Sequence, residues 1–320
     1  MFQALAAADV LTWVSILVKA SAYAATLLAA GSVLAGVSLR ALEPAGRAAL
    51  NRTAALSALI AALFTGLRLP LRAGFLMGGD LAGATDPMML GVVADSPLGT
   101  SIVLRLVGLV LVLAVLAPGR IASATAVLGA VLVAMSFAFR GHALEEPRVL
   151  LGALVTLHIL GLAFWVGAFA PLARAARRQS PAEAGDLSHE FGLKALWVVA
   201  ALVVSGGLIL LVLGAARPAA LATPYGQAFA VKLTLFAGVL ALAALNKLRL
   251  TPALRAGRAG AADRLRGSIR LEAALIALIL LTTAALTTVT SPPAATTAET
   301  APSPGPVPTS ARALEPGMHT

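Results

Sequence analysis

The sequence predicts an all-α membrane protein, a bundle of about eight transmembrane helices, and three observations support this. Of the 320 residues, 59% are hydrophobic and only 12% are charged, and the mean hydropathy is +0.92. A chain of this composition would not stay dispersed in water, which excludes a soluble globular domain. Several apolar runs reach the roughly 20 residues that a helix needs to cross a bilayer. None of them alternates polar and apolar residues as a membrane strand does, so each is expected to be helical.

Eight apolar segments account for the expected spans. The first is too long, and its N-terminal flank too poor in Lys and Arg, for a cleaved signal peptide, so we expect it to remain as a helix. The second and third segments are the shortest. The expected spans are residues 10–37, 53–69, 100–117, 121–140, 149–171, 191–214, 227–249 and 270–290. Together they form one transmembrane domain over residues 1–290.

Two segments interrupt the helical pattern. Residues 71–99 are rich in Gly and Pro and are expected to form an external loop. Residues 291–320 are rich in Pro, Ala and Thr, which predicts a disordered tail. The loop carries three aspartates and three methionines: Asp80, Asp86, Asp95, Met77, Met88 and Met89.

The distribution of Lys and Arg predicts the orientation of the helices. With eight spans, the loops on one side carry fifteen of these residues and the loops on the other side carry six. Cytoplasmic loops are enriched in Lys and Arg, so both termini are expected outside, in a multi-pass protein of a bacterial inner membrane. The net charge of +10 is then mostly a topology signal, and no nucleic-acid binding is predicted.

Two histidines are the leading candidates for a metal site. Cysteine is absent, so only His, Met and carboxylates remain as metal-binding side chains. His158 lies roughly 14 Å below the outer end of its span, and an ionisable group at such a depth usually faces a partner, a cavity or a metal. His142 is expected at the outer mouth of the fourth span, with Met135, seven residues earlier, on the same helical face. Met77, Met88 and Met89 are weaker candidates.

Imidazole and thioether ligands suit a soft cation such as Cu(I). The two histidines differ in depth by about a dozen ångströms, which favours two successive binding stations over one shared site. The same residues also fit a structural alternative. In that alternative His158 forms a hydrogen bond with a neighbouring helix, His142 is an interfacial residue and the methionines pack.

Motifs in both halves of the chain resemble those of one family. In the first half, SFAFRGHA (136–143) and LHILGLAFWVGAFAPL (157–172) are similar to the GHA and H-x6-W-x-G patterns of the copper resistance protein D (CopD) family. In the second half, FGLKALWVVAALVVSGG (191–207) and TPYGQAFAVKLTLFAGVLALAALNKLRLTPAL (223–254) carry the resemblance. The latter resembles the family's YG, buried Lys, and Asn-basic motif followed by Pro. Residues 191–290 are the most family-like half.

The resemblance implies copper homeostasis, with copper imported across the inner membrane. It also implies a separate periplasmic CopC-like copper-binding protein as partner. By position it makes His142 and His158 the metal ligands, while Trp165 and Gly167 support the fifth helix and Lys232 is the family's buried lysine.

Three cations inside the expected spans do not fit a simple cation path. Lys19, Arg105 and Lys232 fall in the outer half, where no span carries Asp or Glu, and they would repel an entering metal ion. Aspartates of the 71–99 loop are expected to pair with them, or their long side chains to reach the interface. Lys19 lies about as deep as His158, so an uncharged Lys19 amine is a possible hydrogen-bond partner or ligand for that histidine.

Two other functions remain open. A b-type haem would use imidazole as axial ligand and Lys or Arg for the propionates, making the protein an electron carrier. A copper sensor or an assembly partner that does not transport copper would carry the same residues. Neither G-x-x-x-x-G-K-[ST] nor H-E-x-x-H is present, and we expect no enzymatic activity.

Overall fold

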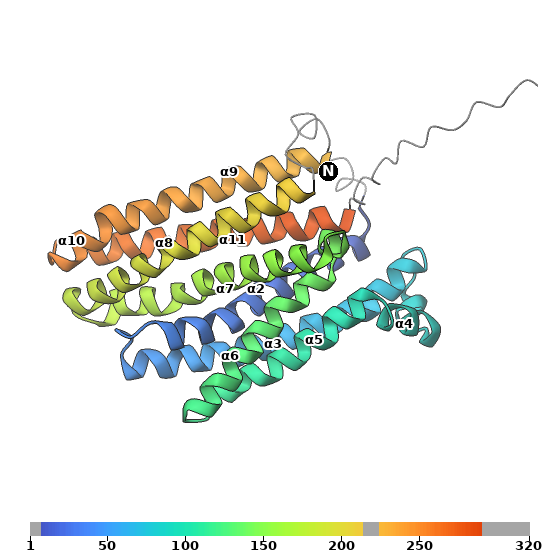
Figure 1. Cartoon of the computed structure of the whole chain (residues 1–320), viewed down its shortest axis with the longest axis horizontal. Coiled ribbons are helices and arrows are strands. Elements are labelled where there is room, and N and C mark those ends of the chain that lie inside the picture. The colour runs from blue at the N-terminus through green and yellow to red at the C-terminus, as the bar shows by residue number, and fades with distance from the viewer. Residues whose placement is uncertain (1–7, 214–223, 290–320) are drawn as a thin grey trace, which may run out of the picture. The chain divides into compact units, whose positions relative to one another are not determined.

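The structure is a computed structural model that describes residues 8–213 and 224–289. Within these ranges all regular structure is helical, and eight helices are long and apolar enough to cross a membrane, which confirms the predicted fold class. The eight are α2 (Val10–Ser38), α3 (Pro44–Leu76), α5 with η2 (Pro97–Leu116), α6 with η3 (Arg120–Phe139), α7 (Arg148–Arg178), α8 (Pro181–Val212), α9 with η6 and α10 (Gly226–Arg255) and α11 (Ala261–Val289) (Figure 1). The predicted tail, residues 291–320, lies outside the described residues.

Helix α2 lies at the centre of the helical domain. It packs against α3, α7, α11 and α6, while α8 packs on α7, α5 on α6, and α9 on α11. The buried core follows this arrangement, with Leu27 and Val33 of α2 against Ala163 and Trp165 of α7. Consecutive spans alternate in direction, so the bundle has two ends. We name them the α4 end, after the short helix α4 (Pro87–Ala94), and the basic end, which carries α10 (Thr251–Arg255) (Figure 1).

Glycine allows α2 and α7 to cross in backbone contact. A Cβ atom on Gly167 would lie 2.0 Å from the carbonyl carbon of Gly31, and one on Gly31 would lie 1.8 Å from the carbonyl oxygen of Ala163. Helix α5 (Pro97–Val112) and α6 (Arg120–Met135) meet in the same way through Gly108 and Gly129. Small residues at crossings are a main source of association between membrane helices, because lipid supplies no hydrophobic force between them. Gly167 therefore supports α7 through its contact with α2.

The prediction of an irregular loop over residues 71–99 is wrong, because most of this segment is helical. Helix α3 continues to Leu76, and the segment then folds into η1 (Leu81–Ala84) and α4 before α5 begins. The aspartates help to explain this, since Asp80 accepts a hydrogen bond from Ala82 N at 3.0 Å and Asp86 one from Met89 N at 2.8 Å. Such side-chain caps favour new helix starts rather than a loop, as does proline at the first position of α4 and α5.

Candidate functional site

His158 lies on the face of α7 that contacts α8. Its Nδ1 atom is 3.1 Å from Oγ of Ser205, a fully buried residue of α8. The Ser205 hydroxyl also lies 3.3 Å from the Leu202 carbonyl, to which it can donate its single hydrogen. In the tautomer that carries its hydrogen on Nδ1, the ring donates to Ser205 and Nε2 keeps a lone pair. A histidine oriented by a hydrogen bond at one nitrogen is the usual arrangement of a metal ligand.

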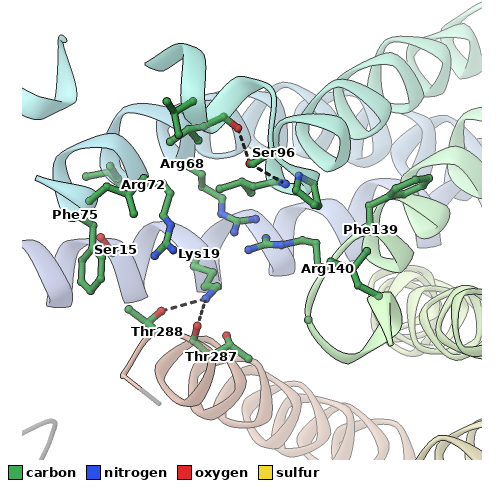
Figure 2. A pocket seen from close by; sticks show the side chains of 18 residues that line it. Ser15, Lys19, Arg68, Arg72, Phe75, Ser96, Phe139, Arg140, Thr287 and Thr288 are labelled. Atoms are coloured by element: carbon green, nitrogen blue, oxygen red, sulfur yellow. Dashed lines mark hydrogen bonds between the residues drawn. The ribbon is translucent and has the colours of Figure 1, made fainter. Parts of the chain in front are cut away.

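The helix-to-helix hydrogen bond of His158 is the one considered in the structural alternative above, and it is compatible with metal binding at Nε2. Lys19, in contrast, is not a partner of His158. Its Nζ atom donates to the Thr287 carbonyl at 2.9 Å and to Thr288 Oγ1 at 3.1 Å, both on α11 (Figure 2). The possible hydrogen bond between Lys19 and His158 is therefore not formed in the structure.

A second buried polar group lies two helical turns further along α7. Trp165, only 2% exposed, donates from Nε1 to Glu272 Oε2 at 3.2 Å, and Asn246 donates to the other carboxylate oxygen. Asn246 begins η6 (Asn246–Leu250), a π-helical turn at the end of α9 (Pro224–Leu245). Such turns occur frequently at functional sites. The carboxylate thus joins three helical elements inside the bundle.

Glu272 was not among the site residues predicted from the sequence, although an isolated carboxylate within an apolar run was the available signal. In the structure Glu272 is 3% exposed, so it is a buried group of α11. Trp165, proposed only as a support for the fifth helix, is the residue that connects it to α7.

The structure does not bring the remaining candidate metal ligands together into one site. Helix α6 ends at Met135 and is followed by η3 (Ser136–Phe139) and an extended Arg140, with φ −149° and ψ 145°. Met135 and His142 are therefore not on one continuous α-helix, and the inference that they share a face is wrong. The backbone of His142 lies in η4 (Gly141–Leu144), which packs against α7, while its side chain lies outside the described part of the structure.

The methionines of the segment after α3 are mostly turned outward. Met77 and Met88 are exposed, Met89 is half-buried, and Met135 is also exposed. Lys232 is half-buried on α9. Among the described side chains, no group of three or more His, Cys, Asp or Glu residues could hold a metal ion. The other described histidine, His189, is exposed near the basic end of α8, so it forms no axial pair with His158 for a haem.

Eight apolar helices with polar side chains buried between them define a polytopic α-helical membrane protein. Two family models match the chain. The model described as copper resistance protein D-like, N-terminal domain, matches residues 9–150, and the model described as copper resistance protein D matches residues 186–286. The chain belongs to the copper resistance protein D family and is a copper-related membrane protein.

The two matched stretches leave residues 151–185 between them, and this interval holds His158, Trp165 and Gly167. His142 falls within the first match and Lys232 within the second. Neither a curated protein nor a solved structure matches the chain.

Proposed function

We propose that this protein moves copper ions inward across the bacterial inner membrane, as a transporter rather than an enzyme. The observation that carries the proposal is the position of His158, whose Nδ1 is held by Ser205 inside the bundle, which leaves Nε2 as the nitrogen for a metal ion. Membership of the copper resistance protein D family supports copper as the cargo. His142, at the α4 end, would act as the first station and His158 as the second.

The direction of transport rests on the distribution of charge. Lys and Arg concentrate in the loops of the basic end, so this end would face the cytoplasm and the α4 end the periplasm. A separate CopC-like protein would then deliver copper to the α4 end. The membrane potential would favour entry of a cation by about 2.3 kcal/mol per charge per 100 mV.

Copper accumulation in cells tests the proposal. We expect the wild type to raise cell copper at matched expression, and His158→Ala and His142→Ala to abolish the rise. Ser205→Ala removes the partner of His158 and should lower uptake about tenfold, the lower end of the loss expected when a group that orients a metal ligand is removed. Ser188→Ala is the matched control, because it removes a buried hydroxyl of the same helix that bonds only to the Ala184 carbonyl.

An absorption spectrum of the purified protein separates the other functions. Unchanged cell copper together with a Soret band that His158→Ala removes would establish a haem carrier and overturn the transport proposal. Unchanged copper without a Soret band would leave a sensor or assembly role and would equally overturn it.

A further inference from the structure

A cationic cavity of about 440 Å³ opens near the α4 end of the bundle. Figure 2 shows the side chains of Lys19, Arg68, Arg72 and Arg140 converging on it from α2, α3 and the junction between η3 and η4. Among the described residues that line it, four are basic and none is acidic. It is separate from the contact between His158 and Ser205.

The basic groups of the cavity retain unused hydrogen-bond donors. Arg68 is 7% exposed, and its buried Nη1 atom has no hydrogen-bond partner. The buried Nη1 atom of Arg140 also has none. Lys19 uses two of its three donors on Thr287 and Thr288 and keeps the third. Buried donors without partners are costly, so a cavity lined by several of them indicates a ligand that accepts hydrogen bonds.

A fifth cation lies behind the cavity. Arg105 is fully buried; its Nε donates to Ser136 Oγ at 2.9 Å, but neither of its terminal nitrogens has a hydrogen-bond partner. Its guanidinium lies 4.1 Å from the Phe137 ring centre, Phe137 is 5.3 Å from Tyr23, and Arg68 lies 5.7 Å over Tyr23. Stacking on aromatic faces stabilises the two guanidiniums but leaves their positive charge uncompensated.

The aspartates near this end form no described ion pair with these cations. Asp80 and Asp86 accept backbone hydrogen bonds at the starts of η1 and α4, and Asp9 accepts one from Thr12 at the start of α2. The expected pairing of Asp80, Asp86 or Asp95 with the intramembrane cations is not among the described ion pairs. The charge of the cavity is therefore left for a ligand to neutralise.

We propose that this cavity binds a compact oxyanion group, a phosphate or a carboxylate, through Lys19, Arg68 and Arg140, with Arg72 at its exposed edge. Arginine presents a planar fork of donors that matches the paired oxygens of both groups. The oxyanion comes either from a phospholipid head group or from a small anion in solution. The inference does not depend on copper transport, because its residues and its test are different.

Binding to the purified full-length protein tests the proposal. In dodecyl maltoside, a detergent without charge or phosphate, we would measure co-purified phospholipid by native mass spectrometry. We would also titrate inorganic phosphate, citrate and phosphatidylglycerol at constant ionic strength, following thermal unfolding. Arg68→Gln should weaken binding about 10-fold to 100-fold, the loss expected for a hydrogen bond to a charged group. Arg148→Gln, an exposed arginine of α7 that does not line the cavity, is the matched control.

Arg72→Gln provides a second variant, since this exposed residue can be changed without disturbing the buried packing. It should fold normally and weaken binding less than Arg68→Gln does. Stabilisation by phosphate or citrate that the cavity variants reduce would assign a soluble anion. Retained phospholipid that the cavity variants release would assign a head group. No retained lipid and no stabilisation, or stabilisation that persists in both variants, would overturn the proposal.

Discussion

Substitution of Gly167 by alanine gives the sharpest test of the packing. The added Cβ would lie 2.0 Å from the Gly31 carbonyl carbon and 2.6 Å from Ser32 N. Restoring an ordinary contact of about 3.4 Å requires α2 and α7 to separate by more than an ångström. A gap of that size removes a quarter to a half or more of the dispersion energy of the contacts beside it.

The expected cost follows from these distances. Overpacking typically costs about 1–3 kcal/mol, and the upper end applies because both clashes are with backbone. The higher helix propensity of alanine offsets at most about 1 kcal/mol. Gly167→Ala should therefore destabilise the protein by about 2 kcal/mol or more.

Reversible unfolding of the detergent-purified protein measures this loss. Gly66→Ala and Gly207→Ala are matched controls, because a Cβ at either helical position meets nothing within 4 Å. Both should be neutral or slightly stabilising. Equal stability of Gly167→Ala and the controls would show that α2 and α7 do not cross as closely as described, and the packing argument would fail.

Three further outcomes are expected in the same unfolding assay. Glu272→Gln places an amide donor against Trp165 or Asn246 and should cost about 1–3 kcal/mol, whereas Asp186→Asn, at an exposed ion pair with Arg255, should change stability little. Ser101→Ala removes a buried 2.6 Å hydrogen bond to the Ser136 carbonyl and should cost about 1 kcal/mol, while Ser123→Ala, an exposed site, should cost almost nothing. Hydrogen bonds from Thr12 lower the pKa of Asp9 below its usual value. The stabilisation that the Asp9 carboxylate provides is therefore present at neutral pH and is lost as the pH falls through the lowered pKa. The difference in stability between wild type and Asp9→Ala should vanish on acidification.

The eight spans were predictable because length and hydropathy alone specify them. Their exact ends were not. Helix α3 extends to Leu76, although the expected span ended at residue 69, so the buried Arg68 lies within the helix and not at its end. The pairs Asp86-Pro87 and Ser96-Pro97 were legible signals of new helix starts within the supposed loop.

The site was predictable only in part, because periodicity gives the depth and face of a residue but not its neighbour. His158 could be singled out as an ionisable residue within an apolar span, yet nothing in the sequence pointed to Ser205, which lies 47 residues away on α8. Trp165 and Glu272 are separated by 107 residues and meet only when α7 and α11 pack together. The same limit explains why Thr287 and Thr288 were not foreseen as the partners of Lys19.

The cationic cavity also constrains the copper route. A sphere of its volume has a radius of about 5 Å, so a charge on its wall lies about 6 Å from the centre and repels a monovalent ion by about 3 kcal/mol at an effective dielectric constant of about 20. Arg68 and Arg140 alone then oppose entry by about 6 kcal/mol, whereas a potential of 100 mV supplies only about 2.3 kcal/mol. The membrane potential is therefore too weak to drive a bare copper ion through the empty cavity. On the transport proposal, copper would pass through this cavity only beside a bound oxyanion that neutralises the arginines.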